Sequence, residues 1–237
     1  MGAPSMPATP PNSTTPRLHA LVPCAGTGSR AGTAGPKQYQ PLAGQPMVLH
    51  TVAALAQVQR LSTVLVVVAP GDATLQESGT FSVAACGGST RAATVISGLS
   101  ELQRRGAGPG DWVLVHDAAR CLVTATLVDA LIDACLADPV GGLLAIPLAD
   151  TMKSEEGGRA LATLPREGKW LAQTPQMFRL GLLQQALEKA GPGVTDESSA
   201  VEALGHRPLL VPGSAQNFKV TYPDDFALAQ AVLRSRA

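Results

Sequence analysis

The fold is decided by the stretch Val22-Pro-Cys-Ala-Gly-Thr-Gly-Ser-Arg-Ala-Gly-Thr-Ala-Gly-Pro-Lys37, which begins in an apolar run and continues as a loop of small residues. Such a transition is typical of a buried strand that leads into a phosphate-binding turn. The loop holds four glycines and two cations, Gly26, Gly28, Gly32, Gly35, Arg30 and Lys37. Glycine lets main-chain N–H groups approach an anion, and the cations add fixed positive charge. The expected ligand is a nucleoside triphosphate, and the alternative is a glycine-rich surface turn with incidental charges.

Two better-known phosphate motifs do not match this loop. A P-loop needs Gly-Lys followed by Ser or Thr, whereas Lys37 lies between Pro36 and Gln38. The loop fits the loose dinucleotide pattern at residues 26–31, but Pro36 interrupts the helix that should begin there. That pattern also expects an acidic residue about 20 positions further on. The first acidic residue after the loop is Asp72, and a dinucleotide site is therefore excluded.

Apolar runs alternate with stretches of helical spacing along the chain. Strands are expected at Leu18–Pro23, Thr63–Ala69, Phe81–Ala85, Trp112–His116 and Gly142–Pro147. Helices are expected at Pro46–Val58, Thr90–Leu102, Thr124–Ala137, Arg179–Ala190, Asp196–Leu204 and Pro223–Leu233, with Thr195 and Thr221 as N-caps of the last two. This alternation predicts an α/β fold with a mainly parallel sheet flanked by helices.

Two segments depart from the alternation. Residues 1–17 lack the basic start and apolar centre of a secretion signal, and we expect a disordered tail there, followed by one domain at 18–237. Residues 149–171 carry many charges between two apolar stretches. We expect this second segment to form an arm that leaves the domain and reaches another subunit.

Composition excludes several classes of function. Eighteen Lys and Arg balance 18 Asp and Glu, and a formal net charge of +0 favours neither nucleic acid nor a membrane surface. The longest apolar runs fall short of the roughly 18 residues that a membrane span requires. The four cysteines, Cys24, Cys86, Cys121 and Cys135, form no Cys-x-x-Cys pair, which argues against a zinc site and against a disulfide scaffold. A reducing cytoplasm is the expected location.

A carboxylate follows the apolar run Trp112–Val115, in the motif His116-Asp-Ala-Ala-Arg120. Magnesium takes one or two protein carboxylates together with phosphate oxygens and water. Asp117 is therefore the candidate magnesium ligand beside a triphosphate, and the alternatives are a helix cap or a pair with Arg120. We expect His116 to be structural, because nucleotidyl transfer to a phosphate needs no general base.

Two further motifs complete the predicted site. Ligands of open parallel sheets bind beyond the carboxyl ends of the strands, so the loops of Gly26, Gly88 and Asp117 should share one crevice. Main-chain groups at Gly88 and the hydroxyl of Thr94 suit the edge of a pyrimidine, with an ordinary glycine turn as the alternative. Lys219 is expected in a short apolar strand at 217–221, as a second phosphate contact or as a snorkelling edge lysine.

Together these motifs resemble those of the 2-C-methyl-D-erythritol 4-phosphate cytidylyltransferases of the non-mevalonate isoprenoid pathway, over about residues 18–234. The matching segments are Pro23–Arg30, Pro36–Tyr39, His116–Arg120, Asp150–Lys153, Gln173–Gln176, Thr195–Glu197 and Asn217–Thr221. The resemblance implies a Rossmann-like nucleotidyltransferase fold. It also implies a homodimer in which the arm of one chain completes the active site of its partner.

The resemblance implies a role for each matching position in the transfer of CMP from CTP to methylerythritol phosphate. CTP would be bound by Pro23, Ala25, Gly26, Gly28, Gly88 and Thr94. The catalytic residues would be Arg30 and Lys37 on the triphosphate and Lys219 on the reacting phosphorus, with Mg²⁺ at Asp117. The acceptor phosphate would be bound by Arg166 of the other subunit, assisted by Thr151, Thr195 and Arg120.

Some positions differ from the pattern of the family. Thr94 stands where serine is usual, and Cys121 where proline is common. Ser89 takes a position that is often acidic, and Ala149 one that is often arginine. Two alternatives stay open, a cytidylyltransferase acting on another polyol phosphate such as ribitol phosphate, and a catalytically silent nucleotide sensor.

Overall fold

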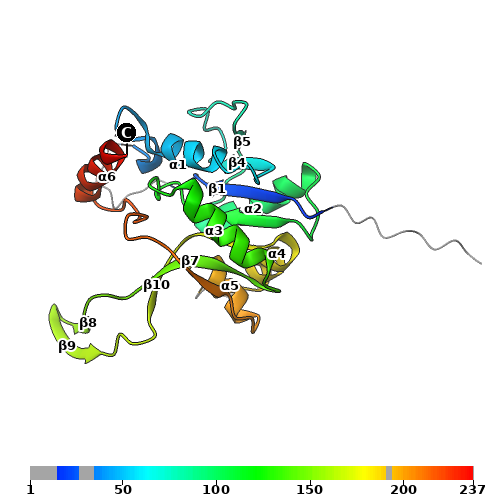
Figure 1. Cartoon of the computed structure of the whole chain (residues 1–237). Helices are drawn as coiled ribbons and strands as arrows, with labels where there is room; N and C mark the ends of the chain where they lie inside the picture. The colour runs from blue at the N-terminus through cyan, green and yellow to red at the C-terminus, as the bar shows by residue number, and fades with distance from the viewer. Residues whose placement is uncertain (1–14, 27–34, 191–193, 237) are drawn as a thin grey trace, which may run out of the picture.

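The computed structural model describes residues 15–26, 35–190 and 194–236, and its centre is a seven-stranded sheet with helices on both faces (Figure 1). The strand order is β11-β7-β10-β6-β1-β4-β5. The bounds are β1 Leu18–Pro23, β4 Thr63–Val67, β5 Ser82–Ala84, β6 Trp112–Val115, β7 Gly141–Pro147, β10 Trp170–Arg179 and β11 Leu209–Pro212. Every pairing is parallel except those of β10, which runs antiparallel to β6 and β7. The predicted α/β fold with a mainly parallel sheet is confirmed.

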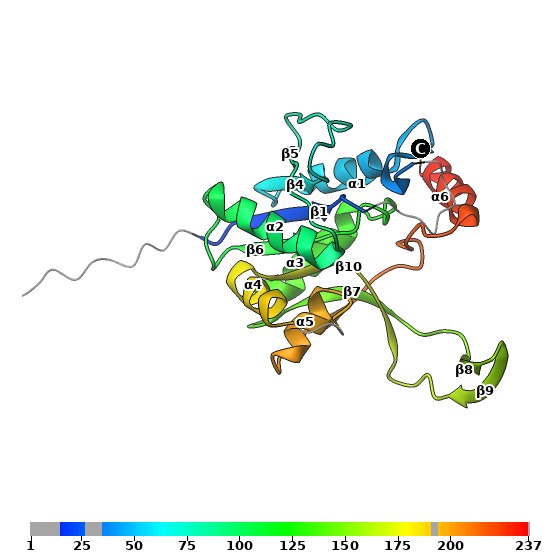
Figure 2. The same ribbon diagram turned by 180° about the vertical axis from the view of Figure 1, so that it is seen from behind.

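Side chains of each central strand point alternately to two cores. Ala20 and Val22 of β1 belong to one core, and Leu21 between them belongs to the other. The first core is covered by α1 (Met47–Ala56) and α3 (Ala125–Leu136). The second is covered by α2 (Arg91–Arg104), α4 (Leu180–Lys189) and α5 (Glu197–Ala203), seen from behind in Figure 2.

A smaller third core lies next to the segment that carries Lys219. It joins the two-residue strand β2 (Pro41–Leu42), which pairs with β3 (Gln45–Pro46), to the C-terminal helix α6 (Pro223–Ser235). Leu42, Met47 and Val220 are buried in it. Because Val220 directly follows Lys219, this packing fixes where the lysine leaves the backbone.

Between β7 and β10 the chain forms a protruding hairpin, which lies within the segment 149–171 and is called the arm below. Strands β8 (Met152–Glu156) and β9 (Arg159–Leu164) pair only with each other, and every residue of β9 is exposed. Figures 1 and 2 both show the hairpin extending away from the sheet, beyond the ends of β7 and β10 to which it is joined.

Several local predictions are wrong. Strands β10 and β11 were not expected, and residues 217–221 form a loop instead of the predicted strand. The N-cap of α5 is Asp196 rather than Thr195, because the Asp196 carboxylate accepts from Ser199 N at 3.0 Å. The N-cap of α6 is Tyr222 rather than Thr221.

Other expectations about the chain have mixed outcomes. All four cysteines are free thiols, as their spacing predicted. Among the described residues, no helix is both long and apolar enough to cross a membrane. Most of the predicted tail, residues 1–14, lies outside the described part of the chain, as do Gly28 and Arg30.

Candidate active site

The predicted crevice exists at the carboxyl edge of the parallel strands. The loops after β1, β5 and β6 line one cavity of about 260 Å³ together with the 3-10 turn Lys37–Tyr39 and the loop of Lys219. Its lining includes Pro23, Cys24, Ala25, Gly26, Lys37, Gln38, Gly88, Ser89, Thr90, Arg91, Thr94, Asp117 and Lys219. Eight of the positions predicted from the sequence therefore surround one space, although they come from distant parts of the chain.

Asp117 lines this cavity and is 7% exposed. Its Oδ1 accepts from Arg91 Nε at 2.8 Å, and its Oδ2 lies 2.7 Å from Lys219 Nζ. Burial alone raises the pKa of Asp117, but the charges of Arg91 and Lys219 outweigh burial and hold the pKa well below its usual range. Asp117 is thus a carboxylate at any physiological pH. Its cationic partners are not the Arg120 that sequence reasoning offered as an alternative.

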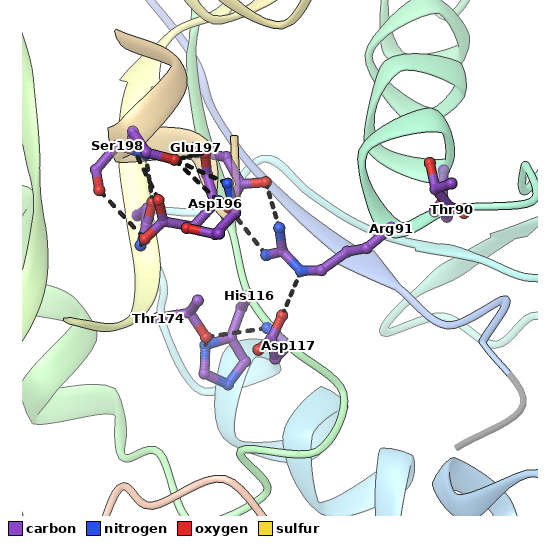
Figure 3. A network of polar contacts seen from close by, with 12 residues as sticks. Thr90, Arg91, His116, Asp117, Thr174, Asp196, Glu197 and Ser198 are labelled. Carbon is purple, nitrogen blue, oxygen red and sulfur yellow. Dashed lines mark hydrogen bonds and ion pairs between the residues drawn. The ribbon is translucent and has the colours of Figure 1, made fainter. Parts of the chain in front are cut away.

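Arg91 joins Asp117 to a second carboxylate. Its two terminal nitrogens bind the two oxygens of Glu197 at 2.7 and 2.9 Å, and Glu197 is fully buried (Figure 3). Sequence reasoning gave Arg91 no role. A signal was present, because an arginine directly after the N-cap Thr90 opposes the helix dipole and calls for a carboxylate partner.

The glycine loop is tied to the turn that carries Lys37. The side-chain amide of Gln38 donates to the carbonyl oxygens of Cys24 and Gly26 at 2.9 and 2.8 Å. Lys37 Nζ donates to Val220 O at 2.6 Å. The start of the loop, Lys37 and the Lys219 segment are therefore held as one unit. Gln38 was not recognised from the sequence either.

The Gly88 loop is held against the start of α2. Gly88 N donates to Thr94 Oγ1 at 3.2 Å, and the Thr94 hydroxyl donates to Thr90 O at 2.9 Å. A Cβ at Gly88 would lie 2.5 Å from the Cβ of Ala93, so only glycine fits this close approach. These contacts hold the Gly88 loop at the wall of the cavity.

His116 is part of the scaffold and is fully buried. Its Nδ1 accepts from the Thr174 hydroxyl at 3.0 Å, and its Nε2 donates to Arg120 O at 3.1 Å. Thr174 Oγ1 in turn accepts from Asp117 N at 3.0 Å. Burial lowers the pKa of His116 to about 4, so the ring is neutral and orients the Asp117 backbone without acting as a base.

The positions expected to bind the acceptor are spread more widely. Arg120 donates to Asn217 O at 2.7 Å and to Ala172 O at 3.1 Å, and it does not line the cavity. Thr195 lines a neighbouring hollow that also contains Arg91. Thr151 and Arg166 belong to the exposed arm, where Arg166 donates to the carbonyl oxygen of Ala149. One chain does not bring these two arm residues to its own cavity.

The donor set fits a metal ion only if the nucleotide supplies most of the ligands. Among the described residues, no cluster of three or more His, Cys, Asp or Glu side chains is placed to hold a metal. The single ionised carboxylate of Asp117 matches the habit of Mg²⁺, which combines one or two carboxylates with phosphate oxygens and water.

Comparison with known proteins identifies a family for the chain. The sequence model of the family "2-C-methyl-D-erythritol 4-phosphate cytidylyltransferase" matches residues 18–235. The enzyme of that name from Nitrosomonas eutropha is 52% identical, over 92% of this chain and 97% of the relative. The bifunctional enzyme IspD/IspF of Albidiferax ferrireducens is 66% identical over 96% of this chain, which spans only 56% of that longer protein.

Solved structures give the same result. A crystal structure of 4-diphosphocytidyl-2C-methyl-D-erythritol synthase superposes with a TM-score of 0.84 at 37% identity, covering 93% of this chain and all of that one. The cytidylyltransferase from Thermus thermophilus gives a TM-score of 0.77 at 32% identity, over 92% of this chain and 99% of that one. The chain belongs to the 2-C-methyl-D-erythritol 4-phosphate cytidylyltransferase family.

Proposed function

We propose that the chain transfers CMP from CTP to 2-C-methyl-D-erythritol 4-phosphate, yielding 4-diphosphocytidyl-2-C-methyl-D-erythritol and pyrophosphate. The observation that carries this proposal is the convergence of Lys37, Asp117 and Lys219 on one cavity that also contains the Gly88 loop. Family membership supplies the identity of the substrates. It also favours this acceptor over ribitol phosphate and an enzyme over a silent sensor.

The reaction needs positioning and charge neutralisation more than it needs acid–base groups. An oxygen of the acceptor phosphate attacks the α-phosphorus of CTP in line, a new P–O bond forms, and the bond to the leaving pyrophosphate breaks. Lys219 stabilises the reacting phosphorus, and Lys37 with Arg30 holds the triphosphate. Lys37 and Lys219 reach the same cavity from separate segments, which supports roles at two points of one nucleotide.

The cytidine half of CTP fits the preorganised loops. We assign its contacts to main-chain groups of Ala25, Gly26 and Gly88, with Pro23 and Thr94 shaping the wall. Gly28 completes this set. The internal hydrogen bond between Gly88 N and Thr94 Oγ1 supports a loop that is already in position before CTP arrives.

Asp117 would hold Mg²⁺ together with the triphosphate. The ion would supply neutralisation of the charge that builds up on the phosphates. The strongly lowered pKa of Asp117, caused by Arg91 and Lys219 against the effect of burial, supports this role because a metal ligand must be ionised.

The acceptor site requires a homodimer. The arm exposes Leu161 by 66% and Leu171 by 49%, an apolar surface that a second chain would cover. In that arrangement Arg166 and Thr151 of one chain bind the acceptor phosphate at the cavity of the other, next to Thr195 and Arg120. The domain at 18–237 with its arm at 149–171 would then act as a cytoplasmic dimer.

Pyrophosphate release from CTP with Mg²⁺ tests the function directly. We expect release with methylerythritol phosphate and little with ribitol phosphate at the same concentration. Release with ribitol phosphate alone would identify the other polyol-phosphate activity. Tight CTP binding without release for either acceptor would leave the sensor alternative.

A further inference from the structure

Two cations share Asp117, and they are anchored differently. Arg91 Nε binds Oδ1, while Arg91 also has both terminal nitrogens on the buried Glu197. Lys219 Nζ binds Oδ2, and within the described residues Asp117 is its only ion-pair partner. The Arg91 and Lys219 side chains are 30% and 37% exposed, so the two cations differ in their number of carboxylate contacts and not in their exposure. Arg91 is therefore fixed, and Lys219 can leave.

The geometry of the guanidinium means that Glu197 determines how many oxygens of Asp117 are bound by Arg91. A free arginine pairs with a carboxylate through two parallel N–H···O bonds, so it covers both carboxylate oxygens. Here that fork is taken by Glu197, and Arg91 presents only Nε to Asp117 (Figure 3). Without Glu197, Asp117 is the carboxylate within reach of the fork. Both of its oxygens would then be occupied by arginine.

We propose that Glu197 is a positioning residue of the transfer reaction. It restrains Arg91 to a single bond with Asp117 and so keeps one carboxylate oxygen for an exchangeable partner. In the nucleotide-free protein that partner is Lys219, and in the complex it is the divalent cation of metal-bound CTP, which frees Lys219 for the phosphate. The inference rests on the cation role of Asp117 proposed above.

The charges of the cluster predict opposite effects of a Glu197 substitution on the binding of metal-free CTP and on the binding of the cation. Arg91 and Lys219 balance Asp117 and Glu197, so neutralising Glu197 leaves one excess positive charge beside the phosphate site. Metal-free CTP, an anion, should bind as well as before or more tightly. The cation should bind less well, since it must compete with a forked arginine for Asp117. A loss of local structure alone would weaken both.

The test is the ratio of CTP affinity with Mg²⁺ to CTP affinity in EDTA, measured by calorimetric titration. In Glu197→Gln we expect this ratio to fall about tenfold, the size of one charge-assisted contact. The matched control is Glu202→Gln, an exposed position on the same helix with the same change in charge, which should keep the wild-type ratio. An unchanged ratio in Glu197→Gln, or an equal fall of both affinities, overturns the proposal.

A second variant tests whether Glu197 acts by restraining Arg91 or independently of Arg91. In Arg91→Met/Glu197→Gln the guanidinium is gone, and the ratio should return to near the wild-type value. This variant removes both charges of the buried pair, so it leaves no buried charge without a partner. A ratio that stays low in the double variant contradicts the restraint.

Asp117→Asn keeps the two proposals distinguishable. If Asp117→Asn leaves the ratio unchanged, the cation role of Asp117 is wrong and the proposed function loses its metal site. If Asp117→Asn lowers the ratio and Glu197→Gln does not, only the role of Glu197 is wrong.

Discussion

The buried cluster around Asp117 and the exposed arm are built on opposite principles. In the cluster, each charge has a partner within the same chain, and Asp117 and Glu197 are almost removed from water. In the arm, every residue from Arg159 to Leu164 is exposed, and the hairpin pairs only with itself. One chain can therefore assemble the nucleotide half of the site, whereas the arm has a defined surface only when something else covers it.

The largest expected effect comes from removing Lys219, the cation of the cluster that has a single carboxylate contact. Lys219→Ala should lower turnover by about 10²-fold or more, because it removes the charge that we propose stabilises the reacting phosphorus. Pyrophosphate release measures it, with the exposed Lys189→Ala as a control of equal charge change. A rate within a factor of two or so of wild type would remove Lys219 from the catalytic step.

The buried histidine of the cluster should make stability depend on pH. Burial lowers the pKa of His116 from 6.5 to about 4, so the unfolded chain takes up the proton first as pH falls through this window. Between pH 7 and pH 5 this group should cost about 2 kcal/mol of unfolding free energy. Urea unfolding of His116→Gln should show a flatter pH dependence, and the exposed His206→Gln serves as control. Parallel curves for wild type and His116→Gln would contradict the assignment.

The proposed role of the arm can be removed without changing the residues that line the cavity. Arg166→Ala should raise the KM for methylerythritol phosphate about tenfold and leave CTP binding unchanged, because only a contact to the acceptor phosphate is removed. Steady-state kinetics with each substrate varied in turn measure the split. An equal rise of both KM values would show that the arm supports the whole site.

Mixing the inactive Lys219→Ala chain with Arg166→Ala sharpens the same comparison. If the arm crosses between subunits, half of the mixed dimers' sites combine an intact Lys219 with an intact Arg166, so about a quarter of all sites recover. No recovery after exchange of subunits would argue that each arm serves its own chain.

Sequence patterns predicted the alternating strands and helices because the central strands carry continuous apolar runs. Strand β10 escaped notice because its middle is polar. Gln173 is buried there through hydrogen bonds with Asn217 and Ser214, and Gln176 through Asp196. In the sequence such polar residues indicate a loop, and only hydrogen bonds with other segments allow them to be buried in a strand.

The candidate site was predictable to a similar degree. Lys37, Asp117 and Lys219 stood out because a charge beside an apolar run or a glycine loop requires an explanation. Arg91 and Glu197 did not, since the unfavourable place of Arg91 at a helix N-terminus does not say which carboxylate is its partner, and Glu197 looks like an ordinary acidic residue in the first turn of a helix. Their importance comes from facing each other across 106 residues of sequence.

The sequence by itself determined the family and most of the alternating strands and helices, because each of these depends on residues that are neighbours in the chain. Only the tertiary structure decided which cation each carboxylate receives. Arg91 lies 26 residues from Asp117 and 106 from Glu197, and no local pattern encodes a bond between side chains that the fold brings together. The pairing is set where α2, α5 and the end of β6 meet, because the carboxylates of Asp117 and Glu197 are almost removed from water there and would be costly without cationic partners.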